Sequence, residues 1–291
     1  MGVTAFGHRR APAPESISPA RDPHRFINEL DDAMIERLVA RLESRGKDQV
    51  FTRLFERYAS RLDLPAGSET LEIGSGTGVV ARGLARRDDM LGDVTGIDQS
   101  PVFVEIAQGF AKAEGLADQI SFQVGDAHAL PFEPARFDAV IAHTLISHAT
   151  DPATVFAEAR RVLKPGGTLI VFDGDYASLT YGYGDAEAGR RMDWALARAT
   201  FNNPLVMRGM AEQLPDAGLT LTDTIADVVL EIGAGSFFRS MAETYAPLIA
   251  KSGLADSAEV DAWLGYQHAA IEAGRFFASC NYYSVIAQRP G

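Results

Sequence analysis

Residues 70–78 read Thr-Leu-Glu-Ile-Gly-Ser-Gly-Thr-Gly, and this stretch decides the fold. Residues 71–73 predict a short buried strand. Gly74, Gly76 and Gly78 predict a tight turn, because a Cβ there would block the bend and keep a ligand off the backbone. From Val79 onward, apolar residues recur with helical spacing. A strand, a glycine turn and a helix in this order form the phosphate- or nucleoside-binding corner of a doubly wound α/β fold.

The spacing of the glycines separates two kinds of ligand. The dinucleotide fingerprint is G-x-G-x-x-G, in which a pyrophosphate lies on the helix N-terminus. Here the pattern is G-x-G-x-G, and Glu72 directly precedes it. A carboxylate repels a diphosphate and attracts a ligand that carries ammonium and sulfonium groups. The pattern therefore favours a cationic nucleoside, with a nicotinamide dehydrogenase on the same fold as an alternative.

A second acidic residue follows at an informative interval. Residues 93–97 predict the second strand, and Asp98 ends it about 20 residues beyond the last glycine. At that interval an acidic side chain reaches a ribose diol and accepts charge-assisted hydrogen bonds from it. Ser100 and Pro101 then predict the start of a helix, as N-cap and first-turn residue.

Three further segments read as short strands bounded by turn residues: 120–124, 137–142 and 168–172. Gly-Asp-Ala at 125–127 and Leu-Pro-Phe at 130–132 follow the first of these. His143 follows the second. The helix expected at 153–163 begins after Asp151 and ends at Lys-Pro-Gly-Gly, before the third strand.

These motifs, in this order over residues 67–175, resemble those of the class I S-adenosylmethionine (SAM)-dependent methyltransferases, of the type 11 or UbiE-like small-molecule group. The resemblance implies a doubly wound, seven-stranded, mostly parallel sheet with an antiparallel last strand and helical lid additions. It implies SAM as cofactor and S-adenosylhomocysteine (SAH) as product. It also implies that Asp126 hydrogen-bonds the adenine amino group and that the Ala127 backbone contacts the ring. The cofactor-binding residues expected are Glu72, Gly74, Ser75, Gly76, Gly78, Asp98, Gln99, Asp126, Ala127 and His143.

The chain divides into four expected segments: a mobile arm at 1–23, a helical lid at 24–66, the SAM-binding core at 67–175, and the remaining strands with helical substrate-binding insertions at 176–291. The helices of the second segment either pad the sheet or close over the ligand. In the second case an aromatic residue faces the ligand: Phe26, Phe51, Phe55 or Tyr58. Later elements are expected at 208–217, 219–232, 237–274 and 276–287.

The composition limits the kinds of binding partner and the location that we expect for the protein. The net charge of −12 and pI near 5.0 argue against nonspecific nucleic-acid binding, which needs a basic face. The sequence contains no run of 18 or more apolar residues, so no membrane span is expected. No secretory signal is visible. Cys280 is the only cysteine, which excludes an intramolecular disulfide and a multi-thiolate metal site. We expect a cytoplasmic protein that acts on a small molecule, without a metal.

Methyl transfer to a hydroxyl or an acidic carbon benefits from a base near the carboxyl edge of the sheet. His143 is the candidate catalytic residue, because it follows the fourth strand and an ordinary histidine titrates near neutrality. Its alternative role is a hydrogen bond to the cofactor or to a backbone carbonyl. Asp175 and Tyr176 are second candidates, His148 reads as structural, and His128 reads as a solvent-side loop residue.

Aromatic residues in the two insertions suggest a flat or apolar acceptor, with ordinary core packing as the alternative for any one of them. They favour O- or C-methylation of a small metabolite. A further alternative keeps the bound SAM without methyl transfer. The protein is then a scaffold, or a cyclase that uses SAM only as a bound cation.

Overall fold

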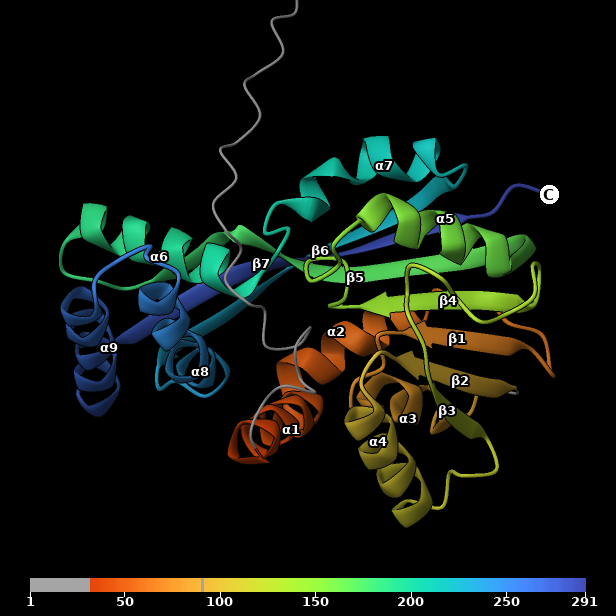
Figure 1. Ribbon diagram of the computed structural model, residues 1–291, viewed down its shortest axis with the longest axis horizontal. Coiled ribbons are helices and arrows are strands. Elements are labelled where there is room, and N and C mark those ends of the chain that lie inside the picture. Colours follow the sequence, from red (N-terminus) through yellow and green to blue (C-terminus); the bar gives the residue numbers. More distant parts are fainter. Residues whose placement is uncertain (1–31, 90–91) are drawn as a thin grey trace, which may run out of the picture.

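A seven-stranded sheet with the order β3-β2-β1-β4-β5-β7-β6 forms the centre of the computed structural model, which describes residues 32–89 and 92–291 (Figure 1). Neighbouring strands from β3 to β5 are parallel, and β7 is antiparallel to both β5 and β6. This confirms the predicted fold class. The strands are β1 (Glu69–Ile73), β2 (Asp93–Asp98), β3 (Ile120–Val124), β4 (Phe137–His143), β5 (Leu163–Tyr181), β6 (Thr220–Gly233) and β7 (Phe276–Gln288).

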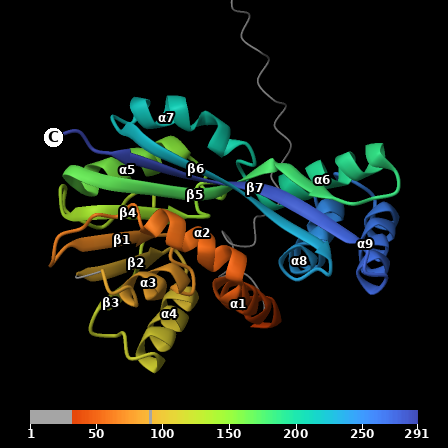
Figure 2. The same cartoon turned by 180° about the vertical axis from the view of Figure 1, so that it is seen from behind.

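Helices cover both faces of this sheet. Helices α3 and α4 lie on one face, and α5 and α7 lie on the other (Figures 1 and 2). Side chains of Ser100 and Asp151 accept backbone N–H groups at the first turns of α4 and α5, which confirms both predicted caps. The helices are α1 (Asp32–Lys47), α2 (Gln49–Ala59), α3 (Val79–Ala85), α4 (Pro101–Ala113), α5 (Pro152–Val162), α6 (Ala186–Thr200), the short 3-10 helix η2 (Val206–Gly209), α7 (Met210–Asp216), α8 (Phe237–Lys251) and α9 (Ser257–Glu272).

The strand β5 is longer than the sequence indicates. It continues past 172 and, after a register shift between Asp175 and Thr180, still pairs with β7. Its glycine and aspartate residues at 173–175 are typical of turns, which is why the predicted strand ended too early. Together with β6 and β7 it reaches beyond the rest of the sheet and carries α6, α8 and α9 (Figure 2).

The elements predicted for the C-terminal half follow the expected order, with α7, β6 and β7 close to their predicted bounds. The expected second helical insertion consists of α8 and α9. The predicted arm at 1–23 and Phe26 lie outside the described residues. Within the part that the structure describes, no helix combines the length and the apolar character that crossing a membrane requires.

Candidate functional site

A cavity of about 910 Å³ opens at the carboxyl ends of β1, β2 and β4. Strand β1 lies between β2 and β4, so this is the point where the strand order reverses and where doubly wound folds bind ligands. The glycine turn and the loops after β2, β3 and β4 line one part of the cavity. Residues of α1, α2 and α8 line the other part. The site is therefore formed by the sheet edge and by helices far away in the sequence.

The glycine turn has the backbone that only glycine adopts easily. Gly74, Gly76 and Gly78 have φ values of +72°, +51° and +77°. A Cβ on Gly74 would lie 2.7 Å from a methyl group of Leu145, and one on Gly78 would lie 2.5 Å from the ring of Phe122. Both the backbone and the close packing therefore require glycine, as the sequence predicts.

The turn does not offer its backbone donors to a phosphate. The N–H groups of Gly74 and Ser75 donate to the carbonyl of Ile97, at 2.8 and 2.9 Å. The N–H of Gly76 donates to Asp98 Oδ2 at 2.8 Å. A phosphate site at a glycine turn needs such N–H groups unpaired. These contacts, together with the nearby carboxylates, disfavour the dinucleotide hypothesis.

Two carboxyl groups, one buried and one partly buried, line the cavity beside the turn. Glu72 is 2% exposed and accepts the N–H of Ala81 at 2.9 Å. Burial raises the pKa of Glu72 well above its usual range, and the neighbouring Asp98 adds to the rise. Burial also raises the pKa of Asp98, which accepts the N–H groups of Gly76 and Ser100. A bound cation would supply the opposite charge that stabilises the ionised form of both carboxyl groups.

The hydroxyl of Ser75 is a further sign of a ligand. Ser75 is 5% exposed and lines the cavity, yet its Oγ has no hydrogen-bond partner in the part of the chain that the structure describes. Buried polar groups in folded proteins are nearly always paired. A polar ligand in the cavity would satisfy this hydroxyl. The residues at this end of the cavity thus fit a nucleoside with cationic and hydroxyl groups.

The loop after β3 brings Asp126, Ala127 and His128 to the same end of the cavity, where Gln99 also lies. Asp126 Oδ1 accepts from the backbone N–H and from Nδ1 of His128, at 2.8 and 2.7 Å. His128 Nε2 accepts the N–H of Asp151 at 3.3 Å. His128 therefore connects this loop to the start of α5. It also lines the cavity, whereas the sequence indicated a loop residue on the solvent side.

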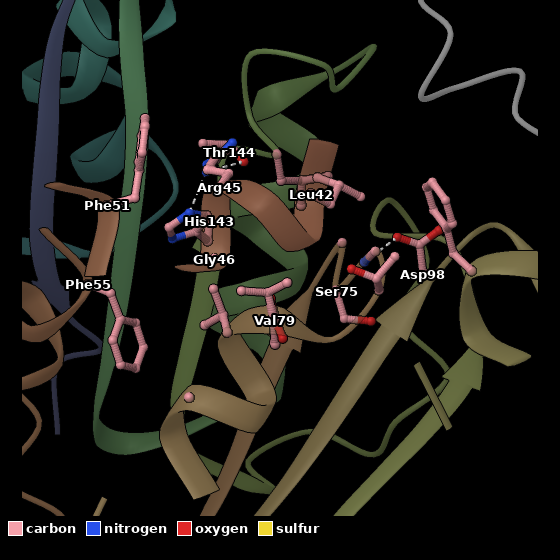
Figure 3. Close-up of a pocket in the computed structure, with 18 of the residues that line it drawn as sticks. Leu42, Arg45, Gly46, Phe51, Phe55, Ser75, Val79, Asp98, His143 and Thr144 are labelled. Carbon is pink, nitrogen blue, oxygen red and sulfur yellow. Dashed lines mark hydrogen bonds between the residues drawn. The ribbon is translucent and has the colours of Figure 1, made fainter. Parts of the chain in front are cut away.

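His143 lies at the junction between the two parts of the cavity. Its Nε2 lies 2.5 Å from Arg45 Nη2 (Figure 3). Its Nδ1 lies 2.8 Å from Tyr58 Oη. A guanidinium can only donate, so we assign an acceptor lone pair to Nε2 and the ring proton to Nδ1. The ring also stacks on Phe172, with centroids 4.5 Å apart. Burial and then the charge of Arg45 hold the pKa of His143 well below its usual range. His143 is consequently neutral, and the expectation of ordinary titration near neutrality does not apply.

The residue after His143 has a strained backbone. Thr144 has a φ of +50°, which is uncommon for a residue with a side chain and is worth about 1–3 kcal/mol of strain. Its N–H donates to the carbonyl of Phe172 at 2.6 Å, and its Oγ1 accepts from Arg45 at 3.1 Å. These contacts hold the strained turn and so fix where β4 delivers His143.

The other candidate bases are placed less favourably. Asp175 is 3% exposed and forms an ion pair with Arg208, at 3.0 Å. It does not appear among the described residues that line the cavity. Tyr176 does line it and stacks on Phe201, with centroids 3.4 Å apart. His148 lines the cavity as well and lies against the ring of Phe201.

Aromatic side chains dominate the part of the cavity beyond His143: Phe51, Tyr176, Phe201, Phe237, Tyr245 and Tyr282. We call this group the aromatic compartment. Figure 3 shows Phe51 and Phe55 on one side of His143, with Ser75 and Asp98 on the other. Other aromatic residues of the insertions, such as Tyr181 and Trp263, pack in the core instead. The sequence did not identify Arg41 and Arg45 as cavity residues. Their four-residue spacing places them on one helix face but does not reveal what that face meets.

Comparisons with known proteins match the same part of the chain. A family model described as a methyltransferase domain matches residues 71–171, which run from β1 into β5. An uncharacterised 37.1 kDa protein encoded in a transposon of Streptomyces fradiae is 32% identical over 238 residues, which are 78% of this chain and 64% of that protein. The 27-O-demethylrifamycin SV methyltransferase of Amycolatopsis mediterranei is 39% identical over 131 residues, which are 45% of this chain and 47% of that enzyme. The match thus spans less than two thirds of each relative.

Among solved structures, the (4+2)-cyclase SpnF resembles the chain with a TM-score of 0.54 and 27% identity. That likeness covers 83% of this chain and 82% of the cyclase. It therefore covers more of the chain than the family model, which matches residues 71–171.

Proposed function

This chain belongs to the class I SAM-dependent methyltransferase family, and from that premise we propose that it methylates a small, mostly apolar or aromatic metabolite on oxygen or carbon. The observation that carries the proposal is the shape of one cavity. Its carboxylate-lined end beside the glycine turn and its aromatic compartment meet at His143. A cofactor in the first part and an acceptor in the second would therefore face each other.

The residues of the carboxylate-lined end have roles that follow from their chemistry. Asp98 would accept hydrogen bonds from the ribose hydroxyls, and Glu72 would compensate a positive charge of the cofactor. Asp126 and Ala127 would hold the adenine, with Gln99 beside it. The unpaired hydroxyl of Ser75 would gain a partner. When bound, SAM supplies a methyl carbon that its positive sulfur has already activated.

The protein then contributes mainly by positioning the acceptor and by excluding water. We assign the lid role to the segment 24–66, because Phe51 and Phe55 of α2 line the cavity and Tyr58 bonds His143. We assign acceptor binding to the segment 176–291, because α8, β5, β7 and the residue after α6 contribute rings of the aromatic compartment. The segment 67–175 remains the SAM-binding core.

His143 is the proposed general base. Its neutral ring has one lone pair, on Nε2, and Arg45 occupies that lone pair in this structure. Proton transfer from an acceptor therefore requires Arg45 to move away from Nε2. The N–H at Nδ1 keeps its hydrogen bond to Tyr58 Oη, and this contact keeps the ring oriented during the transfer.

Binding of SAM is expected to release a proton. The pKa of Glu72 is raised by burial, so the carboxyl group holds a proton more readily before binding. A cation beside the group favours its charged form and lowers that pKa. The affinity for SAM should therefore rise with pH through the range in which free Glu72 titrates. Calorimetry in buffers of different ionisation enthalpy measures the released proton.

The matched control for this measurement is Glu72→Gln, which keeps the size of the side chain and removes its titration. The variant should bind SAM more weakly than the wild type and should release fewer protons per molecule of SAM bound. Equal proton release by both proteins would mean that another group titrates.

A second candidate function is chemistry without methyl transfer, and two observations favour it. The chain resembles a cyclase at 27% identity over most of its length. In addition, Arg45 blocks the only lone pair of His143 that accepts a proton. In this case SAM would remain bound and unchanged.

One experiment tests the proposal against this second candidate. The protein is incubated with SAM and a library of apolar phenols, enols and carboxylic acids, and the products are analysed by mass spectrometry. We expect SAH to accumulate in step with an acceptor that gains the mass of a methyl substitution. An acceptor that is converted while SAM is unconsumed would contradict methylation and favour the second candidate.

A further inference from the structure

Two arginine side chains of α1 reach the aromatic compartment. Arg41 donates to the carbonyl of Phe237 at 3.3 Å and lies over the rings of Phe237 and Tyr245, at 4.8 and 5.1 Å from their centroids. Arg45 contacts His143 and Thr144 and lies 4.9 Å from the ring centroid of Phe51. Both guanidinium groups line the cavity and are partly buried.

All of these partners are neutral. Within residues 32–89 and 92–291, no carboxylate forms an ion pair with either guanidinium. Other arginines at the cavity differ in this respect, since Arg82 pairs with Glu43 and Glu114. A cation that leaves water without an opposite charge is poorly compensated, because ring faces and neutral acceptors replace only part of its hydration.

Charge is separated along the cavity. Glu72 and Asp98, which form no ion pair within the described residues, lie beside the glycine turn. Arg41 and Arg45 lie beyond His143. Burial raises the pKa of Tyr282 at the far end of the cavity, and the charges of Arg45 and Arg41 act against that rise. The end that suits a cationic cofactor is therefore acidic, and the end that remains for the acceptor is basic.

We propose that Arg41 and Arg45 form an anion subsite that recognises an acidic group on an otherwise apolar acceptor. This inference rests on the proposed function and adds the charge of the substrate class to it. The rings of the aromatic compartment would bury the apolar body, and the planar guanidinium groups would donate pairs of hydrogen bonds to a carboxylate or a phosphate ester. An acidic group at Arg45 would also compete with His143 for that side chain, and so would free the lone pair of Nε2.

The test uses competitors that share one ring system and differ in charge. The neutral fluorophore N-phenyl-1-naphthylamine reports occupancy of the aromatic compartment by its emission. It is displaced with 2-naphthoate, 2-naphthyl phosphate or the neutral 2-naphthamide, with and without SAH. We expect at least one acid to displace the fluorophore about tenfold more strongly than the amide, as charged hydrogen bonds predict. The ranking of the two acids identifies the acidic group.

The double variant Arg41→Gln/Arg45→Gln should lose this preference and still bind the neutral fluorophore. The matched control is Arg37→Gln/Arg53→Gln, which removes two exposed charges from α1 and α2 outside the cavity and should keep the preference. Thermal melting confirms that both variants are folded. Equal displacement by acids and amide in the wild type, a preference that survives in the first variant, or a wild type that does not bind the fluorophore would overturn the anion subsite.

Calorimetric titration of the same samples with SAH keeps the two proposals apart. A wild type that fails to bind SAH contradicts the proposed function, whatever the competitors do. A wild type that binds SAH and does not distinguish acids from the amide contradicts only the anion subsite.

Discussion

Replacing His143 with alanine should lower kcat by about 10²- to 10⁴-fold, the usual contribution of a general base. The dissociation constant of SAM should change little, because the proposed cofactor contacts lie at the glycine turn and the loops after β2 and β3. Stopped assays of SAH formation give kcat, and calorimetry gives the dissociation constant. If SAM affinity falls as much as turnover, His143 is instead a cofactor contact, which is the alternative that its position left open.

The matched control is Tyr58→Phe, which removes the partner of Nδ1 and leaves the lone pair of Nε2 in place. We expect a smaller loss of turnover from this variant than from His143→Ala. A loss as large as that of His143→Ala would mean that the orientation of the ring, rather than its basicity, limits the rate.

The pH dependence of the wild type provides a separate check. Burial and Arg45 hold the pKa of His143 well below 6.5, so the basic form should persist through pH 6.5. The rate of methyl transfer should therefore show no fall centred near pH 6.5 and should decline only in more acidic solution. A fall centred near 6.5 would indicate a histidine with an ordinary pKa and would contradict this account.

Replacing Asp98 with alanine should weaken SAM and SAH binding by about two orders of magnitude. Each charged hydrogen bond contributes about 1.5–3 kcal/mol, and a ribose diol forms up to two of them with this carboxylate. Asp98 also anchors the N–H of Gly76, so its loss loosens the turn itself. Calorimetric titration with SAH measures the effect without turnover.

Asp223→Ala is the matched control, because it removes the same side chain from an exposed ion pair with Arg61 on the edge strand β6. Such pairs contribute about 0–1 kcal/mol, and this variant should bind SAH like the wild type. An Asp98→Ala protein that melts normally and binds SAH with wild-type affinity would remove Asp98 from the cofactor site.

Local sequence rules predicted most of the fold. The order of the strands along the chain, the glycine turn and the N-caps Ser100 and Asp151 depend on neighbours in the chain, and the structure confirms them. The end of β5 was wrong because its continuation depends on pairing with β7, which lies a hundred residues further on. A strand held by such distant pairing is not recognisable from its own residues.

The site was less predictable where distant segments meet. The sequence placed His143 at the sheet edge, but its neutral state depends on its burial and on Arg45, a residue of the N-terminal helix α1. Likewise, Tyr176 lines the cavity and Tyr181 packs in the core, although both are aromatic residues of one segment. Which ring faces a ligand is decided by tertiary packing and not by residue type.

The central claim is that the carboxylate-flanked glycine turn selects a cationic nucleoside over a diphosphate. Isothermal titration of the wild-type protein with SAM, SAH and NAD tests this claim most directly. We expect one molecule of SAM or SAH to bind per chain, with no heat of binding from NAD. Saturable binding of NAD by a protein that leaves both S-adenosyl compounds unbound would contradict it.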